Sequence, residues 1–202
     1  MTDISPKAEI DPKAKIGENC KIYPFAYIEG DVEIGDGCTI YPFVSIMNGT
    51  RMGKNNTVHQ GSVLGALPQD FDFKGEDSQL VIGNENIIRE NVVINRATHA
   101  DGKTVIGNGN CLMEGAHISH DTKMGNQCVL GYGTKIAGDC FIEDGAIFSS
   151  SVIANAYRLV FHGQTSLFDA VLQIEQQVPD SPEIRHIIEF LRATELGIIT
   201  KM

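Results

Sequence analysis

Aliphatic residues recur at every sixth position along most of the chain. The series covers positions 4 to 64, resumes from 82 to 94, and resumes again from 106 to 148. Every one of its positions holds Ile, Leu, Val, Met or Phe, and the longest unbroken run begins at Ile4. A six-residue period predicts a parallel β-helix, in which each hexad forms one short strand and a turn and the periodic residues stack inside.

A second position in each hexad, four residues after the apolar one, is small. It holds Ala8, Ala14, Cys20, Ala26, Val32, Cys38, Val44, Ala116, Thr122, Cys128, Thr134, Cys140 and Ala146. Small side chains fit where the chain turns a tight corner. Four of the five cysteines fall on this position, so we interpret them as space-filling core residues rather than as metal ligands or redox groups.

A longer repeat sets the number of sides. The tetrapeptide Ile-Tyr-Pro-Phe occurs at 22–25 and again at 40–43, eighteen residues later. Eighteen residues are three hexads, so each coil is expected to have three strands, with neighbouring coils satisfying each other's backbone groups. The predicted fold class is mainly β, a parallel β-helix over residues 1–150.

Two interruptions of the repeat, at 66–81 and 97–105, are predicted to be loops. The register survives both, so we expect them to protrude from otherwise continuous coils. Loops on a rigid scaffold are where binding residues concentrate.

The pattern changes near residue 151. Nineteen of the 21 glycines precede it, and the remainder of the chain has apolar residues at helical spacing. Helices are expected over 152–162, after the capping pair Thr165–Ser166, and after Ser181-Pro182-Glu183, with a stop at Gly197. The sequence thus predicts a small C-terminal α-helical domain over 151–202.

Composition narrows the function classes. A net charge of −10 argues against a general nucleic-acid binder. The apolar runs are too short to span a bilayer, and the N-terminal residues lack a secretory pattern, so no stable membrane insertion is expected. Five cysteines without a CxxC pair are typical of a reduced, cytoplasmic protein.

The pair His117 and His120, in the segment Ala-His-Ile-Ser-His-Asp, is the main candidate for chemistry. Ile118 takes the inward position, so both histidines are expected to point away from the core and to be exposed. They could be plain surface residues. One could be a general base supported by Asp121. A zinc site is a third possibility, but residues three apart on an extended strand are separated by roughly 10 Å, so a partner subunit would have to add His59 or His99.

These motifs occur in an order that resembles a known family. Gln69-Asp70-Phe71 in the first loop is followed by residues 116–121, by Ala137-Gly138, and by a tail beginning Asn-Ala-Tyr-Arg-Leu at 155. In this respect the chain is similar to the acyl-carrier-protein-dependent UDP-N-acetylglucosamine O-acyltransferases, which catalyse the first step of lipid A biosynthesis, and the likeness covers nearly the whole chain.

The resemblance implies a left-handed β-helix, a handedness that the period alone does not give, assembled as a homotrimer with active sites between subunits. It implies transfer of an (R)-3-hydroxyacyl chain from acyl carrier protein to the 3-hydroxyl of UDP-N-acetylglucosamine, without a cofactor or a metal. His120 would be the general base, Asp121 its support and the Gly138 N–H the oxyanion donor. Gln69, Asp70 and His117 would hold the sugar nucleotide.

The sequence departs from the family pattern in three places. Asp72 stands where the family usually has a lysine, with Lys74 two residues further on, and Asp139 stands where a histidine often follows the oxyanion glycine. In addition, roughly fifty to sixty residues of further hexads that the family normally carries are absent near 150–155.

Three other functions stay open on the sequence. The chain could be the related UDP-3-O-acylglucosamine N-acyltransferase, although the Gln-Asp loop and the tail favour the O-acyltransferase. It could be a zinc enzyme of the β-helix carbonic anhydrase type. It could also be a catalytically impaired variant that binds the nucleotide without turning it over.

Overall fold

The computed structural model describes residues 1–148, 167–178 and 182–193. The chain divides into two compact units, Met1–Phe148 and Ser149–Met202.

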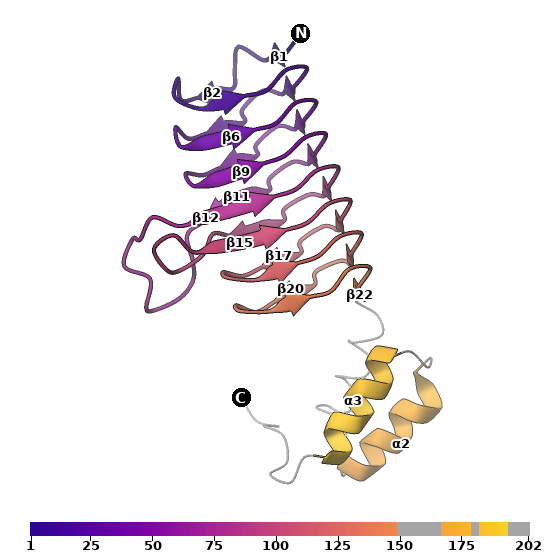
Figure 1. Cartoon of the computed structure of the whole chain (residues 1–202). Helices are drawn as coiled ribbons and strands as arrows, with labels where there is room; N and C mark the ends of the chain where they lie inside the picture. Colours follow the sequence, from indigo (N-terminus) through magenta and orange to yellow (C-terminus); the bar gives the residue numbers. More distant parts are fainter. Residues whose placement is uncertain (149–166, 179–181, 194–202) are drawn as a thin grey trace. The chain divides into compact units, whose positions relative to one another are not determined.

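The first unit is a stack of short parallel strands that form three sheets (Figure 1). Sheet A consists of β1 (Asp3–Ile4), β4 (Lys21–Ile22), β7 (Thr39–Ile40), β10 (Thr57–Val58), β13 (Ile87–Ile88), β16 (Cys111–Leu112), β19 (Val129–Leu130) and β22 (Ile147–Phe148). Sheet B consists of β2 (Glu9–Ile10), β5 (Tyr27–Ile28), β8 (Ser45–Ile46), β11 (Val63–Ala66), β14 (Val93–Asn95), β17 (His117–Ile118) and β20 (Lys135–Ile136). Sheet C consists of β3 (Lys15–Ile16), β6 (Val32–Ile34), β9 (Thr50–Met52), β12 (Gln79–Ile82), β15 (Lys103–Ile106), β18 (Lys123–Met124) and β21 (Phe141–Ile142).

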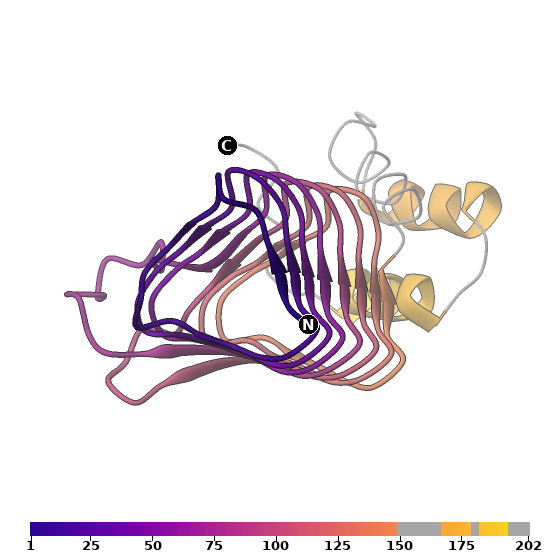
Figure 2. The same cartoon turned by 90° about the horizontal axis from the view of Figure 1, so that it is seen from above.

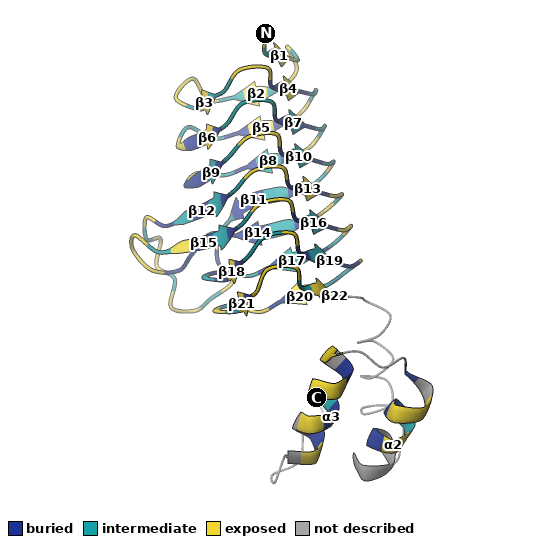
Figure 3. Ribbon diagram, turned by 45° about the vertical axis from the view of Figure 1, so that its right-hand side comes forward, coloured by how far each residue is buried: buried dark blue, intermediate teal, exposed yellow. Residues whose placement is uncertain are grey.

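The three sheets enclose a triangular cross-section, which is seen along the stack in Figure 2. Each periodic residue pairs with the periodic residue of the next coil, as Ile22 does with Ile40 and Ile118 with Ile136. These side chains fill the interior. In the first coil, which has only one neighbouring coil, they are more exposed (Figure 3). The predicted left-handed parallel β-helix with three strands per coil is confirmed.

The small positions of the hexads are filled as expected. Cys20, Cys38 and Cys128 are buried, and Cys140 is half-buried against the same core. Each of the three buried thiols lies within hydrogen-bonding distance of backbone carbonyls of its own and the adjacent coil.

Between Cys38 and Cys128 the same interior column holds three buried asparagines, Asn56, Asn86 and Asn110. The Asn86 side chain donates to Asn56 Oδ1 at 3.0 Å and to the Gly107 carbonyl at 3.0 Å. Its own Oδ1 accepts the Asn110 N–H at 2.9 Å. The column therefore connects successive coils through side-chain amides that stand in for missing backbone partners.

Two segments leave the solenoid from one corner, between sheets B and C, and extend beyond the cross-section (Figure 2). The first runs from the end of β11 to the start of β12, and the second from the end of β14 to the start of β15. The expected loops are shorter than predicted. β12 begins inside the first expected range and β15 inside the second, and the two strands pair with each other over four residues.

The second unit contains α2 (Leu167–Gln177) and α3 (Pro182–Ala193). They share an apolar cluster of Val171, Ile174, Val178, Ile184, Ile188 and Leu191. Pro182 lies in the first turn of α3, as predicted. The helix expected over 152–162, the stop at Gly197 and the family segment absent near 150–155 all fall outside the described residues. Of the helices that are described, neither is long and apolar enough to cross a membrane.

We predict that Asn86→Ala destabilises the solenoid by about 3 kcal/mol, because the half-buried Gly107 carbonyl and the buried Asn110 N–H both lose their side-chain partner. Urea unfolding would measure the change. The matched control is Asn84→Ala, whose side chain also bonds between coils but is exposed, so that water replaces the lost contacts and the cost is below about 1 kcal/mol. Equal costs for the two variants would contradict the assignment of the interior amides as coil connectors.

Candidate active site

His120 lies at the B–C corner, two residues after the inward Ile118 of β17. Only 9% of its surface is exposed. The expectation of an exposed imidazole is therefore wrong for this residue. Its position in the hexad does point outward, but Asp121, Asp70 of the first loop and the backbone of Gly138 lie against the ring.

Asp121 holds one side of the imidazole. Its Oδ2 lies 3.0 Å from His120 Nδ1, and the same oxygen accepts the Thr98 hydroxyl at 2.7 Å and the Thr98 N–H at 3.1 Å. The Asp121 N–H donates to Thr104 Oγ1 at 2.8 Å. With a left-handed φ of 58°, Asp121 turns back towards the second loop. An anionic acceptor at Nδ1 favours the tautomer that leaves Nε2 as the free base.

The pKa of Asp121 reflects these contacts. Burial by itself raises the pKa, but the hydrogen bonds from Thr98 and His120 outweigh it, and the pKa lies below its ordinary value. Asp121 is therefore ionised at neutral pH, and it can stabilise an imidazolium that forms on its neighbour.

The Nε2 side of the imidazole faces Asp70 and Gly138. Asp70 Oδ2 lies 3.4 Å from His120 Nε2, longer than a good hydrogen bond. A Cβ atom at Gly138 would lie 2.4 Å from His120 Cε1 and 2.6 Å from Nε2, so only glycine fits here. Among the described residues, the Gly138 N–H has no hydrogen-bond acceptor. A free backbone donor thus lies one coil away from the candidate base.

The structure does not bring every expected residue to this point. Gln69 is exposed, and no contact between it and His120 is found in the described part of the chain. His117 is half-buried on the outer face of sheet B. Burial lowers the pKa of His117, and Lys135 on the adjacent strand lowers it further.

The histidines considered for a zinc site lie apart from each other. His59 stacks on Tyr41 with ring centroids 4.7 Å apart, and its Nδ1 faces Glu90 Oε1 at 3.5 Å. His99 is exposed on the second loop. Within residues 1–148, 167–178 and 182–193, no three His, Cys, Asp or Glu side chains are grouped so that they could hold a metal ion.

At the two substituted positions, 72 and 139, the side chains are acidic, and no basic side chain of the described residues pairs with the base. The Asp72 N–H donates to Asp70 Oδ1 at 2.8 Å. Lys74 donates to the Phe71 carbonyl within the first loop. The Asp139 N–H donates to the His120 carbonyl at 3.0 Å.

Thr98 is the site residue that sequence reasoning missed. It lies in the second loop, and neither the hexad period nor the quoted motifs mark it. In the sequence Thr98 is simply a hydroxyl residue in a predicted loop, and such residues are too common to single one out.

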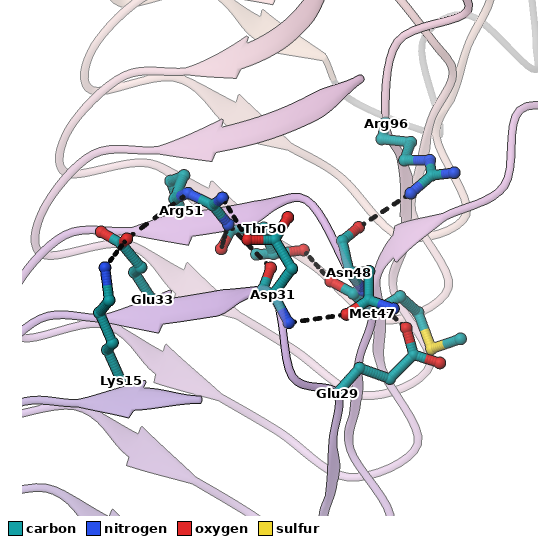
Figure 4. Close-up of polar contacts among 9 residues, drawn as sticks. All are labelled: Lys15, Glu29, Asp31, Glu33, Met47, Asn48, Thr50, Arg51 and Arg96. Atoms are coloured by element: carbon teal, nitrogen blue, oxygen red, sulfur yellow. Dashed lines mark hydrogen bonds and ion pairs between the residues drawn. The ribbon is translucent and has the colours of Figure 1, made fainter. Parts of the chain in front are cut away.

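A groove of about 920 Å³ in the first unit does not have His120 in its lining. It lies on the other side of the loops and is lined by Asp31, Asn48, Ser78, Arg96 and Lys103, among others. Figure 4 shows polar contacts of its lining residues: Arg96 donates to the Asn48 carbonyl at 3.2 Å, and Asp31 pairs with Arg51 at 2.5 Å. The Arg96 contact ties the start of the second loop to the N-terminal coils.

The geometry around His120 defines a class of chemistry. A buried imidazole oriented by a carboxylate can take a proton from a hydroxyl, and a nearby backbone N–H can stabilise an oxyanion. On a solenoid of hexad repeats this combination is suited to the transfer of a group to a hydroxyl.

Comparison with known proteins supports this class. The model of the bacterial transferase hexapeptide (six repeats) matches residues 13–46 and 103–138, and the model of UDP N-acetylglucosamine O-acyltransferase domain 2 matches 149–199. An acyl-[acyl-carrier-protein]–UDP-N-acetylglucosamine O-acyltransferase of Pseudomonas entomophila is 54% identical over 101 residues, 50% of this chain and 39% of the relative. The chain thus spans about two fifths of the length of the curated relatives that it matches.

Solved structures extend the likeness over the whole chain. The crystal structure of LpxA, a UDP-N-acetylglucosamine acyltransferase from Bacteroides fragilis, is 38% identical with a TM-score of 0.66, covering 97% of this chain and 99% of that one. LpxA from Acinetobacter baumannii is 27% identical with a TM-score of 0.64, covering 97% and 99%. The chain belongs to the UDP-N-acetylglucosamine acyltransferase family.

We predict that Thr98→Val raises the pKa of Asp121, because the carboxylate loses the hydroxyl donor that favours its charged form. Because the folded-state pKa lies below the unfolded one, ionised Asp121 stabilises the fold at neutral pH, and this contribution is lost as pH falls through the folded pKa. The variant should therefore lose about 1–2 kcal/mol at pH 7 and less in acid.

Carbon-13 NMR titration of the Asp121 carboxyl group and urea unfolding at two pH values would measure both effects. Thr98→Ser retains the hydroxyl and is the matched control, with an Asp121 pKa close to that of the wild type. An unchanged Asp121 pKa in Thr98→Val would show that the hydroxyl does not act on this carboxylate.

Proposed function

We propose that the chain transfers an (R)-3-hydroxyacyl group from acyl carrier protein to the 3-hydroxyl of UDP-N-acetylglucosamine, the first step of lipid A biosynthesis. The observation that carries the proposal is the 3.0 Å contact between His120 Nδ1 and Asp121, with Nε2 directed towards Gly138. The names of the relatives supply the substrates.

In the proposed reaction His120 Nε2 takes the proton of the 3-hydroxyl as its oxygen attacks the thioester carbonyl. The carbonyl oxygen becomes an oxyanion, which accepts the Gly138 N–H. As the tetrahedral intermediate collapses, the carbon–sulfur bond breaks and the imidazolium returns the proton to the leaving thiolate. Asp121 stays ionised throughout and stabilises the imidazolium.

Asp70 contributes to the acceptor's position. Its carboxylate is 3.4 Å from Nε2, so a hydroxyl entering beside Nε2 comes within reach of it. Asp70 would accept a hydrogen bond from a sugar hydroxyl, with Gln69 and His117 contacting other parts of the sugar nucleotide. This arrangement orients the acceptor before proton transfer.

Acyl carrier protein and further copies of this chain are the proposed partners. The copies are proposed to form a homotrimer. Exposed aromatic rings support a contact with another protein surface: Phe25 and Phe43 stack with centroids 5.3 Å apart, yet are 53% and 63% exposed. Large exposed apolar groups of this kind are typical of protein contacts. The reaction is proposed to take place in the cytoplasm.

The experiment is detection of the product by mass spectrometry, with UDP-N-acetylglucosamine and carrier proteins bearing 3-hydroxyacyl chains of mixed length. The wild type is expected to form the 3-O-acyl product, and His120→Ala to be slower by about 10²–10⁴-fold. His99→Ala, which removes an exposed histidine of the second loop, is the matched control and should stay within a few-fold of the wild type.

Acylation of UDP-3-O-acylglucosamine but not of UDP-N-acetylglucosamine would contradict the proposal in favour of the N-acyltransferase. Binding of the nucleotide without any product, by folded protein, would contradict it in favour of a chain that only binds.

A further inference from the structure

The outer face of sheet B leads from the A–B corner to His120. The first residue of each strand in this sheet points outward, and these residues form one column along the stack. The column consists of Glu9, Tyr27, Ser45, Val63, Val93, His117 and Lys135. Lys135 is its single lysine or arginine, and it is in the last of these seven strands.

Lys135 is directly beside His117. The two residues are register partners in β20 and β17, so their Cα atoms are one strand spacing apart, about 4.8 Å. The Lys135 ammonium donates to the Gly115 carbonyl, which places it level with the start of β17. Lys135 is exposed, and no carboxylate pairs with it among the described residues.

The surroundings of His120 are otherwise acidic. The carboxylates of Asp70 and Asp121 contact the candidate base, Asp139 bonds its carbonyl through a backbone N–H, and the chain as a whole carries a net charge of −10. A nucleoside diphosphate sugar adds two further negative charges. Bringing such a ligand to this surface requires a local cation, since like charges brought together repel each other.

The geometry of the acceptor fits the position of Lys135. When the 3-hydroxyl of the sugar is at His120 Nε2, the diphosphate on C1 is separated from it by the width of the sugar ring. His117 lies in β17 and His120 three residues later, in the turn at the B–C corner, so their Cα atoms are at most roughly 10 Å apart. A sugar aligned along the strand therefore directs its diphosphate towards His117 and the ammonium beside it.

We propose that Lys135 and His117 form the subsite for the diphosphate of the acceptor, with Lys135 supplying the positive charge and His117 a hydrogen bond. This subsite rests on the proposed function for the identity of the sugar, but the binding of a diphosphate can be measured without turnover.

The electrostatics of His117 agree with this division of roles. Burial first and the charge of Lys135 second lower the pKa of His117, so its imidazole is neutral at pH 7 and the lysine carries the charge. A neutral imidazole can still donate one N–H to a phosphate oxygen.

The test is calorimetric binding of UDP-N-acetylglucosamine, UDP and uridine to the full chain. Lys135→Gln is expected to weaken binding of both diphosphates by about tenfold or more, to leave uridine unchanged, and to reduce the dependence of diphosphate binding on salt. Lys135→Arg should restore most of the affinity, because a guanidinium also binds phosphate. Lys123→Gln is the matched control: Lys123 is an exposed lysine that begins a strand in the same way, but in sheet C.

Equal binding of UDP by Lys135→Gln and the wild type would overturn the subsite, as would a wild type that does not bind UDP. A Lys135-dependent UDP affinity without acyl transfer would keep the subsite and refute the proposed function. Acyl transfer with a KM for the acceptor that does not respond to Lys135→Gln would keep the function and refute the subsite.

Discussion

The parallel pairing of each coil with the next is the constraint on which the rest of the structure depends. Strands of two to four residues have little stability alone, and their backbone groups are satisfied only by the adjacent coils. The fixed pairing also sets the site. Gly138 is one coil after His120, and this stacking brings its backbone against the imidazole. A shift of one residue between these coils would replace the glycine with a side chain.

The two loops add to the solenoid what a repeat cannot provide. A regular corner is short and exposed, and a histidine placed there would be solvated. The first loop brings Asp70 to Nε2, while the second brings Thr98 to the carboxylate that holds Nδ1. Because both loops leave the same corner without changing the register, they reach the imidazole and the carboxylate that holds it while the core beneath them stays continuous. The site thus combines a rigid solenoid with polar side chains from two loops.

The sequence predicts the solenoid better than it predicts the conformations of the two loops. The six-residue period is a direct consequence of packing one side chain per strand into a triangular core, so fold class, core residues and the cysteine positions could be read from it. Left-handedness could not, since the usual crossover preference is right-handed, and it came from the family resemblance. The burial of His120 and the role of Thr98 depend on loop conformations that have no period. Lys135 is similar: its hexad position shows that it points outward, but only the strand pairing places it beside His117.

The contact between Asp121 and Nδ1 implies that the imidazole of His120 is held with Nε2 as the free base. Nitrogen-15 NMR of imidazole-labelled protein measures this tautomer, with His120 assigned through its loss in His120→Ala. Neutral His120 is expected to carry its proton on Nδ1 and to have an unprotonated Nε2, and Asp121→Asn is expected to disturb this tautomer. A neutral His120 protonated on Nε2 in the wild type, or one unaffected by Asp121→Asn, would contradict it.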